Sequence, residues 1–176
     1  IAHADRLAHA GVWGKQAIGL TTCVSGKRLG ILGLGAIGAR VAQRAAGFEM
    51  PIGYHNRQPR TGVAHSYFAS VRELADWADC LVVACPGGAA TRHLVDAAVI
   101  DALGPQGVLV NVARGSVVDE SALVAALATG RLGGAALDVF DQEPGIPAAL
   151  AGLDNVVLTP HLAGSTRETW RDAFDL

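Results

Sequence analysis

A glycine-rich stretch, GLGAIG at residues 33–38, constrains the fold of this chain more than any other feature. It follows an apolar run at residues 28–32 and precedes a helical pattern at residues 39–46. The first glycine permits a tight strand-to-helix turn, the second lets the backbone approach a pyrophosphate, and the third lets helix and strand pack closely. The start of the helix also offers unpaired N–H groups to an anion. The stretch therefore predicts a dinucleotide-binding βαβ unit.

The bare glycine pattern has a simpler reading, because a helix that starts with small residues gives the same letters. The surrounding sequence favours the dinucleotide turn. Val41, Ala42 and Ala45 continue an apolar helix face, and a second apolar run at residues 51–54 follows at the distance that a βαβ unit requires.

The rest of the chain alternates apolar runs with helical patterns, which predicts an α/β fold. With 176 residues, of which 51% are apolar, the chain fits one domain over residues 1–176. We expect a Rossmann doubly wound parallel sheet of about seven strands with helices on both faces. Further strands are expected at residues 65–68, 80–84, 107–112, 135–139 and 156–159. Helices are expected at residues 1–10 and 71–78, from Thr91 through Ile100, from Asp119 to Thr129, and from Ser165 or Thr166 to the chain end.

Charge and cysteine content argue against several other classes. The formal charge of −2, without a basic block, argues against nucleic-acid binding, and no apolar run is long enough to cross a membrane. Cys23, Cys80 and Cys85 lack metal-ligand spacing, and their odd number suits free thiols in a reducing compartment. We therefore expect a cytoplasmic protein without a metal. Residues 1–14 lack the apolar core of a secretion signal, and the missing initiator Met predicts a piece of a longer protein.

The loop after the second strand is expected to choose the cofactor. An NAD site usually carries Asp or Glu here, which accepts hydrogen bonds from the ribose 2′-hydroxyl. Residues 54–60 carry no acid and instead supply His55, Asn56, Arg57 and Arg60. We therefore expect NADP(H) to be preferred over NAD(H), with Arg57 binding the 2′-phosphate in a bidentate manner and Arg60 assisting. Ordinary solvated loop arginines are the alternative reading.

Three polar residues follow three successive apolar strands: Arg114, Glu143 and His161. Each has an ordinary reading by itself, as a solvated arginine, a turn acid before proline, or a surface histidine. Ligands of such sheets bind at the carboxyl ends of the strands, so these matching positions lie beside a cofactor crevice. Together they predict an active site. The loop at residues 85–88 is expected to border the cofactor across the crevice.

These three side chains fit the reduction of a 2-keto acid. Arg114 suits the substrate carboxylate, because its planar guanidinium matches a carboxylate and stays cationic. His161 suits protonation of the carbonyl oxygen, since imidazole exchanges protons near working pH. Glu143 would hold the imidazole by a hydrogen bond and keep its acid form populated. In the oxidative direction, the same histidine would act as the base.

Four motifs make the chain resemble the coenzyme-binding domain of the D-isomer-specific 2-hydroxyacid dehydrogenases. They are GLGAIG at residues 33–38, VNVARGSVVDE at residues 110–120, ALDVFDQEP at residues 136–144 and TPHLAGST at residues 159–166. The family's catalytic Arg, Glu and His fall on Arg114, Glu143 and His161. The resemblance also implies that Asp138 contacts the nicotinamide carboxamide.

The expected cofactor contacts combine these inferences. They are Gly33, Gly35, Ala36, Ile37 and Gly38 in the phosphate turn, Asn56, Arg57 and Arg60 after the second strand, Cys85 and Pro86 across the crevice, and Val112, Ala113, Arg114, Asp138, His161, Ala163 and Gly164 near the nicotinamide. The loop NRQPR at residues 56–60 resembles the glyoxylate/hydroxypyruvate reductase branch, which prefers NADPH. The resemblance further implies a homodimer built through this domain, in which residues 1–26, including the loop of Trp13, reach the partner.

The sequence departs from the family in two respects. The substrate domain is absent from this chain, so we expect the isolated piece to bind cofactor and to catalyse poorly or not at all. The loop at residues 85–88 lacks the Thr or Ser that many relatives place there, which leaves the contact at Cys85 open. Two other functions also stay open: an NAD-linked phosphoglycerate-type dehydrogenase, and a nucleotide-sensing, corepressor-like binding module.

Overall fold

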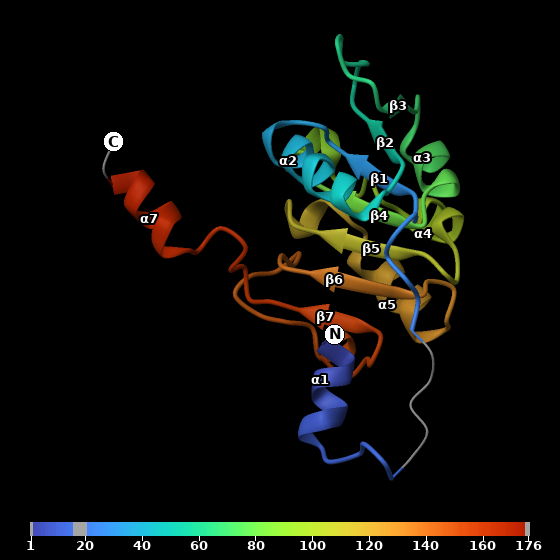
Figure 1. The fold of residues 1–176 in the computed structure, drawn as a ribbon, viewed down its shortest axis with the longest axis vertical. Coiled ribbons are helices and arrows are strands. Elements are labelled where there is room, and N and C mark those ends of the chain that lie inside the picture. The colour runs from blue at the N-terminus through green and yellow to red at the C-terminus, as the bar shows by residue number, and fades with distance from the viewer. Residues whose placement is uncertain (1, 16–20, 175–176) are drawn as a thin grey trace.

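A seven-stranded parallel sheet forms the body of the protein (Figure 1). The computed structural model describes residues 2–15 and 21–174. The sheet order is β3-β2-β1-β4-β5-β6-β7, and every neighbouring pair is parallel. The strands are β1 (Leu29–Leu32), β2 (Ile52–His55), β3 (Ser66–Tyr67), β4 (Cys80–Val83), β5 (Val108–Asn111), β6 (Gly134–Leu137) and β7 (Val156–Leu158). The predicted doubly wound α/β sheet is therefore confirmed.

Helices connect the strands and extend the two ends of the chain. The α-helices are α1 (Ala2–His9), α2 (Ala36–Ala45), α3 (Val71–Trp77), α4 (Ala97–Leu103), α5 (Glu120–Ala128), α6 (Ala148–Ala151) and α7 (Arg167–Phe174). Short 3-10 turns are η1 (Ala46–Phe48), η2 (Ala89–Thr91) and η3 (Gly115–Val117). The helices expected at the two chain ends are present, but residues 1, 175 and 176 lie outside the described residues.

Helices cover both faces of the sheet, as the sequence predicted, because alternate strand residues face opposite sides. Leu29 and Ile31 of β1 pack in one apolar cluster with Ala42 of α2. Leu32, which also lies in β1, packs in the other cluster, which contains Leu74 of α3 and side chains of α4 and α5. The sheet is thus buried on both faces, which leaves its edges and strand ends as the places for polar chemistry.

Side-chain caps begin several helices at the expected positions. Asp119 accepts the N–H of Ala122 at 3.0 Å and starts α5, as predicted. Ser70 and Glu73 form a reciprocal capping box at the start of α3. Such caps satisfy N–H groups that have no partner within the helix.

The predicted helix from Thr91 is wrong. Thr91 ends the 3-10 turn η2, and Val95 pairs with Val118 in an isolated parallel bridge. The α-helix starts only after Asp96, whose side chain accepts the N–H of Val99 at 3.0 Å. A tertiary pairing therefore keeps the preceding apolar residues extended, and the local cap sets the true start.

At the ends of the described chain, α7 extends away from the sheet, whereas α1 lies next to the β7 edge (Figure 1). Trp13 follows α1 and is 84% exposed, so it does not pack against the core of the described chain. Helix α1 is tied to the loop before β7 by Arg6, whose Nη2 donates to the carbonyl oxygen of Asp154 at 3.0 Å. Part of the predicted dimerisation segment, residues 16–20, lies outside the described residues.

Residues 2–15 and 21–174 contain neither a candidate membrane span nor a candidate metal site. No helix in this part of the chain has the length and apolar content needed to cross a membrane. No three His, Cys, Asp or Glu side chains gather there as a metal site would require.

The strand order reverses between β1 and β4, which are neighbours at the centre of the sheet. From β1 the chain passes outward to β2 and β3, and it then returns to β4 and continues to β7 on the other side. Loops diverge at the carboxyl ends of such strands and leave a crevice between them. The fold therefore places the ends of β1, β4, β5, β6 and β7 along one edge.

Candidate active site

Three glycines between β1 and α2 serve different needs. Gly33 has a φ of +98°, and a Cβ there would lie 2.5 Å from the backbone nitrogen of Cys85. A Cβ on Gly38 would lie 2.3 Å from the carbonyl oxygen of Gly33. A Cβ on Gly35 would meet nothing within 4 Å. The protein's own packing therefore requires the first and third glycines, whereas the second keeps the space beside the turn open.

This open space fits the pyrophosphate of a dinucleotide. Gly35 is the N-cap of α2 and makes no side-chain cap. The first N–H groups of the helix have no partner within it and are available to an anion. A side chain at the N-cap would occupy the same place, so the residues present fit an NAD(P) cofactor.

A cleft of about 600 Å³ lies between the phosphate turn and the loops after β4 and β5. Its lining combines expected cofactor contacts, the rest of the expected loop at residues 85–88, and two residues that were not expected, Ala84 and Ser116. The lining residues are Ile37, Ala84, Cys85, Pro86, Gly87, Gly88, Val112, Ala113, Arg114 and Ser116. Burial raises the pKa of the Cys85 thiol, which therefore stays neutral and acts as a cleft wall. Ala84 and Ser116 had no signal in the sequence, since only the packing of loops brings them to the cleft.

The loop after β2 lies against the phosphate turn. Oδ1 of Asn56 accepts the N–H of Leu34 at 2.7 Å. Nη1 of Arg60 donates to the carbonyl oxygen of Leu34 at 2.5 Å. Arg57 lies between them in sequence and is exposed. The structure thus brings Asn56 and Arg60 into contact with the turn, while the contact of Asn56, Arg57 or Arg60 with a ribose 2′-phosphate stays a prediction.

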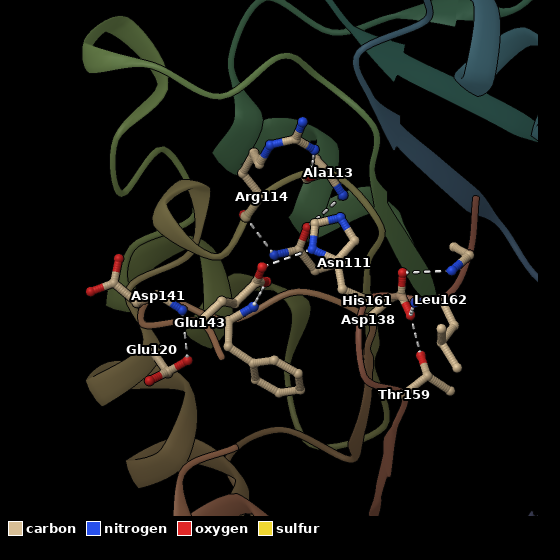
Figure 2. A network of polar contacts seen from close by, with 12 residues as sticks. Asn111, Ala113, Arg114, Glu120, Asp138, Asp141, Glu143, Thr159, His161 and Leu162 are labelled. Atoms are coloured by element: carbon tan, nitrogen blue, oxygen red, sulfur yellow. Dashed lines mark hydrogen bonds and ion pairs between the residues drawn. The ribbon is translucent and has the colours of Figure 1, made fainter. Parts of the chain in front are cut away.

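His161 and Glu143 meet at the edge formed by the strand ends (Figure 2). Nδ1 of His161 lies 2.7 Å from Oε2 of Glu143. A carboxylate can only accept, so Nδ1 carries the hydrogen and Nε2 is left for other chemistry. His161 has a φ of +54°, and its N–H donates to the carbonyl oxygens of Asp138 and Thr159. The backbone of His161 is therefore held in a sparsely populated conformation, and the imidazole lies beside the carboxylate of Glu143.

The carboxylate of Glu143 is held from two sides. The hydrogen bond from His161, and then the N–H of Phe140 at 2.9 Å, hold the pKa of Glu143 below its usual range. The positive charge of Arg114 acts in the same direction. Glu143 is therefore an anion at neutral pH and can accept the hydrogen bond from His161.

Arg114 stands on the neighbouring loop but does not touch this pair. Its Nη1 donates to the carbonyl oxygen of Ala113 at 2.6 Å, and Figure 2 shows the guanidinium turned toward that carbonyl. Asn111, at the end of β5, holds the loop that carries Arg114. Its Oδ1 accepts the N–H of Ala113, and its Nδ2 donates to the carbonyl oxygen of Arg114, both at 3.0 Å. Asn111 is 1% exposed and was missed by the sequence reasoning, although an amide at the end of a buried strand is a usable signal.

Asp138 anchors the loop that follows β7. Its Oδ1 accepts the hydroxyl of Thr159 at 2.5 Å and the N–H of Leu162 at 2.8 Å, while its Oδ2 accepts the N–H of Ala163 at 2.9 Å. Burial raises the pKa of Asp138, but these three hydrogen bonds outweigh it, so the pKa lies below its usual range. In the structure this carboxylate therefore stabilises the loop after β7, and its predicted contact with the nicotinamide carboxamide stays a prediction. Thr159 was not anticipated as a site residue.

Comparison with known proteins identifies the family. Residues 1–163 match the model of the D-isomer specific 2-hydroxyacid dehydrogenase, NAD binding domain. The chain belongs to this family. The resemblance that the four sequence motifs indicated is therefore confirmed, and so is the NAD(P)-binding fold.

Similar members of the family include reductases of keto acids. The chain is 52% identical over 172 residues to glyoxylate/hydroxypyruvate reductase A of Arabidopsis thaliana, a match that covers 98% of the chain and 55% of the relative. It is 51% identical over 176 residues to hydroxyphenylpyruvate reductase of Plectranthus scutellarioides, with 100% and 56% covered. The chain spans about half the length of the curated relatives that it matches.

A solved structure of the same family has a closely similar fold. The NADPH-dependent glyoxylate/hydroxypyruvate reductase of Sinorhizobium meliloti, in complex with NADP and malonate, superimposes with a TM-score of 0.93 at 42% identity. The match covers 99% of this chain and 55% of that one. The fold of the D-isomer-specific dehydrogenases is thus preserved from the phosphate turn to the loop after β7 that carries His161, the histidine loop.

Proposed function

We propose that the protein reduces a small 2-keto acid to a D-2-hydroxy acid with NADPH, and that residues 1–176 form its coenzyme-binding part. The observation that carries this proposal is the contact between His161 and Glu143, 2.7 Å apart at the carboxyl edge of the sheet. A histidine paired to a carboxylate at the end of a cofactor-binding sheet is suited to giving a proton to a carbonyl oxygen. The relatives named above act on substrates of this chemistry.

The residues of this chain would divide the reaction as follows. The bound NADPH supplies the hydride that forms the new C–H bond. His161 gives the proton from Nε2 to the carbonyl oxygen, and Glu143 stabilises the imidazolium before that transfer. Arg114 holds the substrate carboxylate. To do so, its guanidinium either gives up its hydrogen bond to the carbonyl oxygen of Ala113 or keeps it and binds the carboxylate with its remaining N–H groups. Asp138 keeps the histidine loop in register through Leu162 and Ala163.

The preference for NADPH is part of the proposal. The end of β2 presents Arg57 and Arg60 and no carboxylate from Tyr54 to Arg60. A 2′-phosphate would meet positive charge there and no repulsion. The NADP complex of the Sinorhizobium meliloti relative supports this choice.

A homodimer is also proposed, with α1 and the Trp13 segment against the partner. Trp13 exposes 84% of its surface, which a large aromatic side chain rarely does unless another surface covers it. The free cysteines Cys23, Cys80 and Cys85 suit a reducing compartment such as the cytoplasm.

The proposed activity is tested with the full-length protein, because this chain spans about half of its relatives. NADPH oxidation is followed with glyoxylate, hydroxypyruvate and 4-hydroxyphenylpyruvate, each in parallel with NADH. We expect turnover with at least one of these acids and a higher kcat/KM with NADPH. Binding of NADPH without turnover of any small 2-keto acid would overturn the enzyme assignment and favour a nucleotide-sensing module. A preference for NADH would favour the phosphoglycerate-type alternative.

A further inference from the structure

Three hydrogen bonds join the phosphate turn to the loop after β2. The N–H of Gly33 donates to the carbonyl oxygen of His55 at 3.0 Å. The N–H of Leu34 donates to Oδ1 of Asn56 at 2.7 Å, and the carbonyl oxygen of Leu34 accepts from Nη1 of Arg60 at 2.5 Å. Both backbone groups of Leu34 are therefore held by side chains of the loop that faces the ribose.

Leu34 is also fixed by its own side chain. It is 2% exposed and packs in the apolar cluster that contains Ile31 of β1, Ala42 of α2 and Tyr54 of β2. The backbone of Arg60 is anchored to the same cluster, since its N–H donates to the hydroxyl of Tyr54 at 2.9 Å. The side chain of Arg60 therefore runs from an anchored backbone to the phosphate turn, where its guanidinium binds Leu34.

Arg57 differs from Arg60 in this respect. Its side chain is exposed, and among the described residues no hydrogen bond or ion pair engages its guanidinium. A free planar guanidinium can bind a phosphate with two parallel hydrogen bonds, whereas one already bound to a carbonyl oxygen has fewer donors left.

We propose that Arg60 is a positioning residue for the phosphate turn: its guanidinium holds the carbonyl oxygen of Leu34 and does not bind the ribose 2′-phosphate, which the proposed function leaves to Arg57. The inference rests on the proposed use of NADPH, because the 2′-phosphate is the group that separates NADPH from NADH. The pyrophosphate on the turn is common to both cofactors. Loss of Arg60 therefore weakens both cofactors by the same factor, while loss of Arg57 weakens NADPH alone.

The experiment measures dissociation constants for NADPH and NADH by fluorescence titration of the full-length protein. The variants are Arg57→Ala, Arg60→Ala and Arg60→Lys, with Arg72→Ala on the exposed side of α3 as the control. For Arg60→Ala we expect both dissociation constants to rise about tenfold, as befits the loss of one charge-assisted hydrogen bond. Arg60→Lys keeps a donor for the carbonyl of Leu34 and should recover much of this loss for both cofactors. Arg57→Ala should raise the value for NADPH at least about tenfold and leave NADH unchanged.

Two outcomes would overturn the inference. A loss confined to NADPH in Arg60→Ala would make Arg60 a direct phosphate ligand, and unchanged binding of both cofactors would remove it from the site. Where Arg60→Ala does not fold, Arg60→Met keeps the aliphatic stem without a donor and gives the same comparison. These results are separate from the proposed function: a protein that binds cofactor but turns over no 2-keto acid fails the enzyme test, while the ratio of the two losses still decides the role of Arg60.

Discussion

Nδ1 of His161 lies 2.7 Å from Oε2 of Glu143, although the two residues follow different strands of the sheet. Both side chains are partly exposed, with 48% and 34% of their surfaces accessible. The pair is therefore accessible to solvent at the carboxyl edge of the sheet. Its geometry depends on the two loops that follow β6 and β7.

Replacing His161 by Asn should remove activity without disturbing the backbone. Asn tolerates the left-handed conformation that the φ of +54° imposes, but it cannot deliver a proton. We expect kcat to fall by about 10²- to 10⁴-fold, with NADPH affinity unchanged. The matched control is His93→Asn, because His93 has a similar φ of +48° and lies outside the proposed machinery. Steady-state kinetics and cofactor titration check both variants, and full activity in His161→Asn would remove the imidazole from the mechanism.

The glycines of the phosphate turn should separate binding from stability. Gly35→Ala adds a methyl group where the protein has nothing within 4 Å, so we expect unchanged stability and a marked loss of cofactor affinity. Gly38→Ala places a Cβ 2.3 Å from the carbonyl oxygen of Gly33 and should lower the free energy of unfolding by about 1–3 kcal/mol. Urea denaturation and NADPH titration measure the two effects. Normal NADPH affinity in Gly35→Ala would place the pyrophosphate elsewhere.

Gly115 should control the position of Glu143 although it contacts no substrate. A Cβ on Gly115 would lie 1.9 Å from the carbonyl carbon of Phe140, whose N–H holds the Glu143 carboxylate. Gly115→Ala must therefore push the two loops apart, with an expected loss of about 1–3 kcal/mol in stability and a fall in kcat. Gly47→Ala is the control, since a Cβ there would meet nothing within 4 Å. Equal behaviour of the two variants would show that the loops can move without consequence.

Asp138 should make stability depend on pH in a defined direction. Its pKa is lowered in the folded protein, so its contribution is complete above the unfolded pKa of about 3.9 and is lost as the pH falls through the folded pKa. Asp138→Asn should cost about 2 kcal/mol at pH 7, because the hydrogen bonds to Thr159, Leu162 and Ala163 lose their charge. Urea denaturation of both proteins between pH 7 and pH 2 measures the difference. A difference that stays constant over this range would contradict the coupling.

Much of the fold was predictable because its signals are local. The glycine turn, the cap at Asp119 and the apolar strands each depend on residues that are close in sequence. The ends of the strands then followed, and with them the positions of Arg114, Glu143 and His161 on one edge. The failure at Thr91 has the opposite cause, since Val95 pairs with Val118 and no local pattern announces that bridge.

The sequence by itself determined which side chains stand at the carboxyl edge of the sheet and which glycine-rich turn joins β1 to α2. Tertiary structure decided what those side chains touch. It joined Asp138 to Thr159, set Gly115 against Phe140 and directed Arg60 to the backbone of Leu34. The physical reason is that periodicity and caps act over one or two turns of chain, whereas these contacts form only when distant loops pack together.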